Sequence, residues 1–297
     1  MSFFFEVLIG GLLSGVMYSL VALGFVLIYK ASGVFNFAQG AMVFFAALTF
    51  VGVTELGVSP WLAFPITLAA MVLLGLATER VVLRPLVNQP QITLFMATIG
   101  LTFFIEGLAQ LVWGSTVRPL ELGIEDVPLQ WMLDKTGIAV SQFDLIAALI
   151  CAILVAALAV LFSKTKIGRA LRAVADDHQA ALAVGIPLRQ IWAIVWAVAG
   201  FVALVAGLMW GARNGVQFAL TFIALKALPV LILGGFESVA GAIVGGLIIG
   251  ASEKLAEVYL GPYVGGGIES WFPYVLALAF LLLRPEGLFG ERRIERV

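Results

Sequence analysis

Residues 7–29 read VLIGGLLSGVMYSLVALGFVLIY, an uncharged and almost wholly apolar run. The run is longer than the roughly 20 apolar residues that a helix needs to cross a hydrocarbon core. It is also too long for the core of a signal peptide, and no small-residue cleavage site follows it, so we expect a retained helix. Further uncharged runs lie at 31–54 and 56–78. These runs predict a chain that crosses a membrane several times.

The composition indicates the same class. Hydrophobic residues make up 62% of the chain and charged residues 12%, whereas soluble domains carry about 25% charged residues. Backbone groups in lipid must be satisfied within the chain, so each apolar segment is predicted to be a helix. The predicted fold class is all-α, a polytopic transmembrane bundle of about 8–10 segments. Nine segments can be drawn, at 7–29, 38–54, 58–78, 91–113, 142–163, 190–212, 217–235, 238–256 and 268–284.

The count stays open between 214 and 268, where the segments are short and a re-entrant pair is an alternative. With nine crossings, 12 of the 17 basic residues fall on one side of the membrane. Positive residues favour the cytoplasm, so we expect the N-terminus outside and the C-terminus inside. The loop at 114–141 then lies outside, and we expect a surface helix there with Trp131 at the level of the lipid headgroups.

Small residues let membrane helices approach closely. Gly241 and Gly245, like Gly246 and Gly250, have the four-residue spacing of packed helices. We expect this cluster to form a helix contact.

The segment 31–40, ASGVFNFAQG, interrupts the apolar pattern. Two interpretations remain open. A polar break at membrane depth is tolerated where protein covers it or where it lines a watery cavity beside a transport route. A plain cytoplasmic turn is the alternative. Asn36, Gln39 and Thr98 are candidates for lining a solute route, although hydroxyl groups in membrane helices more often bond within the helix bundle.

Glu106 within 91–113 and Lys226 within 217–235 are ionisable residues inside apolar segments. Such residues are expensive in a membrane and are candidates for the solute route. A salt bridge between Glu106 and Lys226 is one hypothesis. Snorkelling of both side chains to the outer interface is the other.

A polar island at 164–189, KTKIGRALRAVADDHQAALAVGIPLR, separates two apolar segments and holds five basic residues and the only histidine. Asp176 and Asp177 can cap a helix start, and Gly185 followed by Pro187 is a stop signal. The island therefore predicts a helix of about two turns near 177–184. We interpret it as a docking element, with Arg169, Arg172, Ala180 and Ala181 on its surface; a basic connector lying on the membrane is the alternative.

Known chemical motifs are absent from the sequence. There is no G-x-x-x-x-G-K-[ST] phosphate loop, no H-E-x-x-H and no G-x-S-x-G. A single cysteine and a single histidine exclude a multi-cysteine metal site. We therefore predict no catalytic residue, no metal and no cofactor bound by this chain, and an intramembrane enzyme is not favoured. An ion-coupled secondary transporter stays an alternative to an ATP-driven one.

Several motifs between residues 11 and 290 resemble those of one family, the permease subunits of ABC importers for branched-chain amino acids and related hydrophobic or amide solutes. The motifs are TKIGRALRAVADDHQAALAVGI, YKASGVFNFAQGAM, ERVVLRPL, ATIGL, LKALPVLILGGFESVAGAIVGGLIIG and LLLRPEGLFG. The resemblance implies one type II-like permease domain over 1–297, with a cytoplasmic coupling loop at 164–190 and a periplasmic loop at 114–141. Gln39 stands where many members have His.

The resemblance also implies partners. These are a second permease subunit, homologous or identical, a periplasmic solute-binding protein, and two ATPase subunits that use ATP and Mg and contact the short helix of the island. The chain would lie in the lipid of a bacterial inner membrane and bind no nucleic acid. The solute would be small and neutral or zwitterionic: a branched-chain amino acid, or a related amide, urea or small organic acid.

Overall fold

The computed structural model describes residues 2–86, 89–176 and 178–290. Its described residues form helices and no strand, as the apolar runs predict. The helices are α1 (Ser2–Ser32), α2 (Gln39–Glu55), α3 (Pro60–Ala77), η1 (Thr78–Leu83), η2 (Arg84–Leu86), α4 (Gln91–Trp113), α5 (Gln130–Thr136), α6 (Gln142–Lys164), α7 (Lys166–Asp176), α8 (His178–Ala183), α9 (Leu188–Asn214), η3 (Phe218–Phe222), α10 (Ile223–Gly234), α11 (Val239–Val264), η4 (Ile268–Ser270) and α12 (Phe272–Leu283).

Among the described residues, six helices are long and apolar enough to cross a membrane, and three shorter apolar helices accompany them. The shorter ones are Gln39–Glu55, Phe218–Gly234 and Phe272–Leu283. Together they correspond to the nine predicted segments, and the weak region at 214–268 resolves into η3 with α10, followed by α11. The polytopic all-α prediction is confirmed.

The chain divides into two compact units. Unit 1 comprises the described parts of Met1–Val26, Gly123–Ala156 and Leu225–Val297, and unit 2 comprises those of Leu27–Leu122 and Ala157–Ala224. Three of the four boundaries along the chain fall inside helices, because α1, α6 and α10 each contribute to both units, and the fourth falls in the loop after α4.

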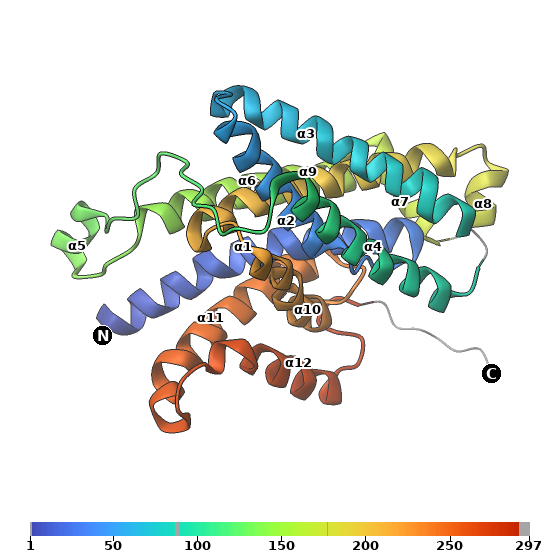
Figure 1. The fold of residues 1–297 in the computed structure, drawn as a ribbon. Coiled ribbons are helices and arrows are strands. Elements are labelled where there is room, and N and C mark those ends of the chain that lie inside the picture. The colour runs from blue at the N-terminus through green and yellow to red at the C-terminus, as the bar shows by residue number, and fades with distance from the viewer. Residues whose placement is uncertain (1, 87–88, 177, 291–297) are drawn as a thin grey trace. The chain divides into compact units, whose positions relative to one another are not determined.

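Helix α2 is the centre of unit 2 and packs against α3, α4 and α9 (Figure 1). Almost every residue from Gln39 to Val53 is buried, as expected for a helix that is apolar on all sides. Trp113 of α4 covers the face of Gly52, and its indole nitrogen donates to Thr49 Oγ1 at 3.2 Å. Helix α3 continues beyond Ala77 into a π-helical turn, η1, which the apolar pattern did not predict.

In unit 1, α11 lies between the N-terminal part of α1 and the α10 helix, and glycines make both contacts. A Cβ atom on Gly250 would lie 2.4 Å from the backbone oxygen of Gly11, and one on Gly245 would lie 2.6 Å from that of Val230. Gly246 meets Gly15 in the same way, and Gly241 meets Gly234. The two glycine pairs of α11 therefore serve two different neighbours, because residues four apart share a helix face.

The loop after α4 contains the short helix α5, and Trp131 on it is exposed. A short helix is thus present where one was expected. In unit 2 the same loop is held by the guanidinium group of Arg118, which contacts the carboxylate of Glu55 and the backbone oxygen of Trp113.

Candidate functional site

The polar break of the sequence is a buried turn between α1 and α2. Gly33 has a φ of +66°, which glycine adopts without strain, and the chain turns there before α2 begins at Gln39. The side-chain oxygen of Asn36 accepts from the backbone nitrogen of Ala38 at 3.1 Å, and Asn36 Nδ2 donates to Gln39 Oε1 at 3.3 Å. Both side chains are fully buried. Protein therefore covers Asn36 and Gln39, as expected for a polar break at membrane depth, and the plain cytoplasmic turn stays the alternative.

The first turns of α4 cover this break in unit 2. The hydroxyl group of Thr98 lies within hydrogen-bonding distance of the backbone oxygens of Phe35 and Phe95, at 3.1 and 2.9 Å. Thr98 is buried. The three polar candidates are thus brought together, because Thr98 bonds to the residue that precedes Asn36. Gln39 Nε2 is buried and has no hydrogen-bond partner among the described residues.

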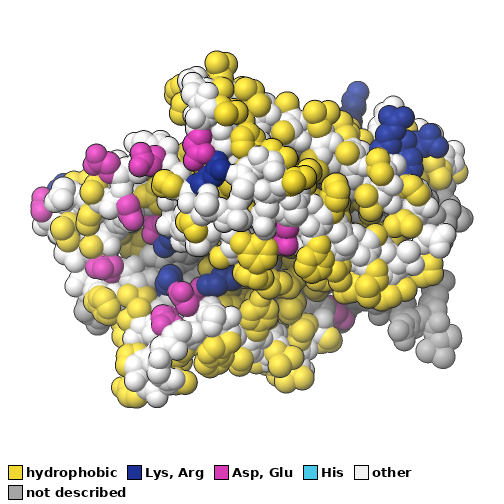
Figure 2. Space-filling view, viewed as in Figure 1, with side chains coloured by type: hydrophobic (Ala, Val, Ile, Leu, Met, Phe, Trp, Pro, Cys, Tyr) yellow, Lys and Arg dark blue, Asp and Glu magenta, His cyan; other side chains and the backbone are white. Residues whose placement is uncertain are grey.

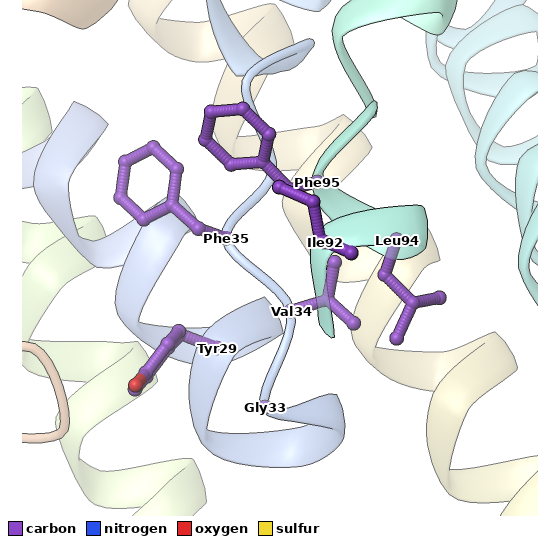
Figure 3. A pocket seen from close by; sticks show the side chains of 7 residues that line it. All are labelled: Tyr29, Gly33, Val34, Phe35, Ile92, Leu94 and Phe95. Carbon is purple, nitrogen blue, oxygen red and sulfur yellow. The ribbon is translucent and has the colours of Figure 1, made fainter. Parts of the chain in front are cut away.

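A cavity of about 300 Å³ lies beside the break. Figure 3 shows the residues that line it: Ile92, Leu94 and Phe95 from the start of α4, and Gly33, Val34 and Phe35 from the extended segment. The lining is largely apolar, since Tyr29 supplies the only hydroxyl group among the seven lining side chains. The cavity suits an apolar group.

The polar island forms two helices, α7 and α8, where a single short helix was expected. Helix α8 spans His178–Ala183, within the predicted range. It ends as its sequence predicts: Gly185 has a φ of +82°, its nitrogen donates to Leu182 O at 3.0 Å, and Ile186 N donates to Ala181 O at 2.9 Å. These two bonds form a Schellman motif. Asp177 lies outside the described residues, and Asp176 is the last residue of α7, so the predicted cap is not described.

The two candidate arginines of the island differ. Arg169 is exposed. The guanidinium group of Arg172 instead donates to the backbone oxygens of Phe162 and Ser163, at the C-terminal end of α6. A cation at that end meets the negative pole of the helix dipole and its free carbonyls. Arg172 therefore positions α7 on α6, while Arg169 stays available to a partner.

Helix α8 also separates its two candidate alanines. Ala181 is buried, and Ala180 is exposed. The neighbouring apolar side chains of Leu182 and Val184 are 54% and 75% exposed. Figure 2 shows Lys and Arg side chains gathered over the α7 part of the visible face, and α7 precedes α8 in the chain.

The two ionisable candidates inside apolar segments have different surroundings. Lys226 Nζ pairs with Glu253 Oε1 of α11 at 2.9 Å, and Tyr18 of α1 donates to the same oxygen at 3.2 Å. Glu106 is buried and forms no ion pair among the described residues. Lys226 is thus paired within unit 1, and a salt bridge with Glu106, which lies in unit 2, stays a hypothesis.

Comparison with known proteins places the chain in a family. The profile of the branched-chain amino acid transport system permease component matches residues 7–284. The chain belongs to this family.

Individual relatives agree with the family match. One is the high-affinity branched-chain amino acid transport system permease protein BraD of Pseudomonas aeruginosa, 26% identical over 99% of this chain and 98% of its own length. Another is the probable branched-chain amino acid transport permease protein LivH of Methanocaldococcus jannaschii, 30% identical over 96% of this chain and 92% of its own length. The chain is a permease, a transport subunit.

Sequence reasoning missed Glu253 as the partner of Lys226 in the permease. A signal was present, since Glu253 lies within the segment predicted at 238–256 and is itself an ionisable residue among apolar ones. The pairing was not predictable from spacing, because Lys226 and Glu253 lie on different helices.

Proposed function

We propose that this permease carries a small neutral or zwitterionic solute, of the branched-chain amino acid type or a related amide, urea or small organic acid, into the cytoplasm. A periplasmic solute-binding protein delivers the solute, and two separate ATPase subunits bind ATP and Mg and drive the cycle. The family match supports the transport role. The relatives named as branched-chain amino acid permeases support the solute class.

The orientation follows from the charges of unit 2. Eight of its ten basic residues lie at one end, here called the basic end. Trp192 Nε1 donates to Ala31 O at 3.0 Å, which ties the start of α9 to the end of α1 at this end. Positive residues favour the cytoplasm. We therefore place the basic end inside, the N-terminus outside and, after nine crossings of a bacterial inner membrane, the C-terminus inside. The basic end carries Lys30, Arg80, Arg84, Lys164, Lys166, Arg169, Arg172 and Arg189.

The observation that carries the coupling proposal is the exposed apolar surface of α8 and its Schellman end. Large apolar side chains exposed together beside basic groups mark an interaction site rather than a solvated loop. The loop at 164–190 is thus the docking site for an ATPase subunit, and Arg169, Ala180, Leu182 and Val184 form its contact surface. ATP-driven closure of the ATPases would move α8 and, through α7, the end of α6 that Arg172 holds.

A second permease copy or a homologous subunit completes the pair around the route. Within this chain, Asn36, Gln39, Thr98, Glu106 and Lys226 remain the proposed route residues. Thr98 and Lys226 act by positioning, because their polar atoms already bond to Phe35 and Glu253.

The test changes the surface of α8 without touching its buried side. Leu182→Asp and Val184→Asp should each reduce co-purification of the ATPase subunits by at least about tenfold, since a charge must be desolvated in the contact. Uptake of leucine into proteoliposomes with ATP inside and binding protein outside should fall in parallel. Val117→Asp is the matched control, because Val117 is exposed at the opposite end of unit 2. Unchanged co-purification and uptake in both α8 variants would refute the docking site, and uptake driven by an ion gradient without ATP would refute the ABC mechanism.

A further inference from the structure

A second cavity lies at the end of unit 2 opposite the basic end. It has a volume of about 310 Å³ and combines two kinds of lining group. The rings of Phe44 and Phe218 meet edge to face with centroids 6.4 Å apart. The polar groups are the carboxamides of Gln110 and Gln217 and the hydroxyl groups of Ser115 and Thr116.

Such a lining fits a solute with an apolar body and one hydrogen-bonding end. Carboxamide nitrogens and hydroxyl groups can donate to a carboxylate, which accepts only. The paired rings offer an apolar surface to a branched side chain. The cavity itself holds no charged lining residue, so an ammonium group would need a carboxylate from elsewhere.

A carboxylate lies one helical turn deeper. Glu106 precedes Gln110 by four residues on α4, and side chains at this spacing share a helix face about 6 Å apart along the axis. Thr221 follows Phe218 by three residues on η3, where residues three apart are aligned. The carboxyl group of Glu106 lies close to the hydroxyl group of Thr221. Glu106 and Thr221 thus form a second polar layer beneath the cavity.

This deeper layer lacks a cation. Glu106 is 7% exposed and forms no ion pair within the described part of the chain, whereas the buried carboxylates of Glu79 and Glu253 are paired with Arg84 and Lys226. The hydroxyl oxygen of Thr221, 9% exposed, makes no full hydrogen bond with any described residue. An unpaired carboxylate inside a membrane protein is strongly unfavourable unless a proton or a cation neutralises it. A cationic group of a solute could reach Glu106 through the open cavity above it.

We propose that this cavity is an entry subsite for zwitterionic amino acids, in which the solute ammonium group binds Glu106 and Thr221. The carboxylate of the solute is held by Gln110 and Gln217, and its apolar side chain lies against the rings of Phe44 and Phe218. The inference rests on the proposed import function and narrows it: α-amino acids bind, whereas ureas, amides and organic acids lack the ammonium group that Glu106 requires.

The test compares two ligands with one carbon skeleton. Leucine carries the ammonium group and 4-methylpentanoate lacks it. Binding to the detergent-purified permease–ATPase complex, without binding protein, is measured by saturation-transfer NMR. The wild-type complex should bind leucine at least about tenfold more tightly, the usual scale of one charge-assisted contact. Glu106→Gln should abolish this preference, because leucine loses its partner and 4-methylpentanoate is no longer repelled.

A gain in affinity for 4-methylpentanoate in the Glu106→Gln variant would show that only the charge is lost, because a misfolded protein would bind neither ligand. Glu121→Gln is the matched control, since Glu121 is exposed in the same unit and does not line the cavity; it should keep the wild-type preference. Equal binding of both ligands by the wild type, or a preference that survives Glu106→Gln, would overturn the subsite. If ATP-driven leucine uptake persists in that case, only the proposed subsite is refuted. If the wild-type complex shows no ATP-driven leucine uptake, the proposed function is refuted as well.

Discussion

At the scale of single residues, the contrast between Glu253 and Glu106 separates a structural charge from a functional one. Glu253 is buried, but it receives the ammonium group of Lys226 and the hydroxyl group of Tyr18. Lys226 of α10 thus neutralises it and Tyr18 of α1 adds a hydrogen bond, so a further cation is not required. Among the described residues Glu106 forms no ion pair, and the hydroxyl group of Thr221 lies near it. The two acids were equally visible in the sequence as ionisable residues in apolar segments, and only their partners distinguish them.

The Lys226–Glu253 pair should therefore matter for stability. Lys226→Met leaves a buried carboxylate without its cation and should destabilise the permease by about 3–5 kcal/mol. The double variant Lys226→Met with Glu253→Gln should recover a large part of that loss, because no uncompensated charge remains. Thermal unfolding in detergent measures both.

The neighbouring pair provides the control. Lys254 Nζ pairs with Glu269 Oε2 at 3.0 Å, and both side chains are more than a third exposed. Lys254→Met should change stability by at most about 1 kcal/mol. A single Lys226→Met variant as stable as Lys254→Met would show that the buried pair contributes no more than an exposed one.

At the scale of helices, the positions of the helices in the sequence were easier to predict than the contacts between them. Length and hydropathy located all nine apolar segments, since crossing a membrane requires both. They did not reveal η1, because a π-helical turn changes the period of the apolar pattern over only six residues. They also did not separate α7 from the connector, because α7 is only 11 residues long and carries Lys166, Arg169 and Arg172 beside its apolar residues.

The glycines of α11 allow a prediction at this scale. Gly250→Ala would place a Cβ atom 2.4 Å from the backbone oxygen of Gly11, so α1 and α11 must separate. We expect a loss of about 1–3 kcal/mol, as for overpacked cores, seen as a lower melting temperature in detergent.

Gly107 on α4 is the matched position. Nothing lies within 4 Å of a Cβ atom added there, and alanine is the better helix former. Gly107→Ala should leave the melting temperature unchanged or raise it slightly. Equal effects of Gly250→Ala and Gly107→Ala would mean that the close contact of α1 with α11 does not limit stability.

At the scale of the whole molecule, much of the candidate site was predictable where it depended on local sequence. The turn at Asn36 and Gln39 and the end of α8 at Gly185 follow from residues a few positions apart. The layer of Glu106 and Thr221 was not predictable from local sequence. These residues are far apart in the chain and come together only when α4 and η3 pack within unit 2. Contacts of this kind require the fold.

The orientation of the whole chain is open to a direct measurement. Cys151 is the only cysteine and is fully buried, so an added cysteine can be labelled over a low background. Val117→Cys and Val184→Cys place exposed thiols at the two ends of unit 2. Because the basic end should face the cytoplasm, a membrane-impermeant maleimide added to intact spheroplasts should label Val117→Cys alone. Val184→Cys should react only after the membrane is permeabilised. The reverse pattern would place α8 outside, where no ATPase could reach it, and would remove both the orientation and the docking site together.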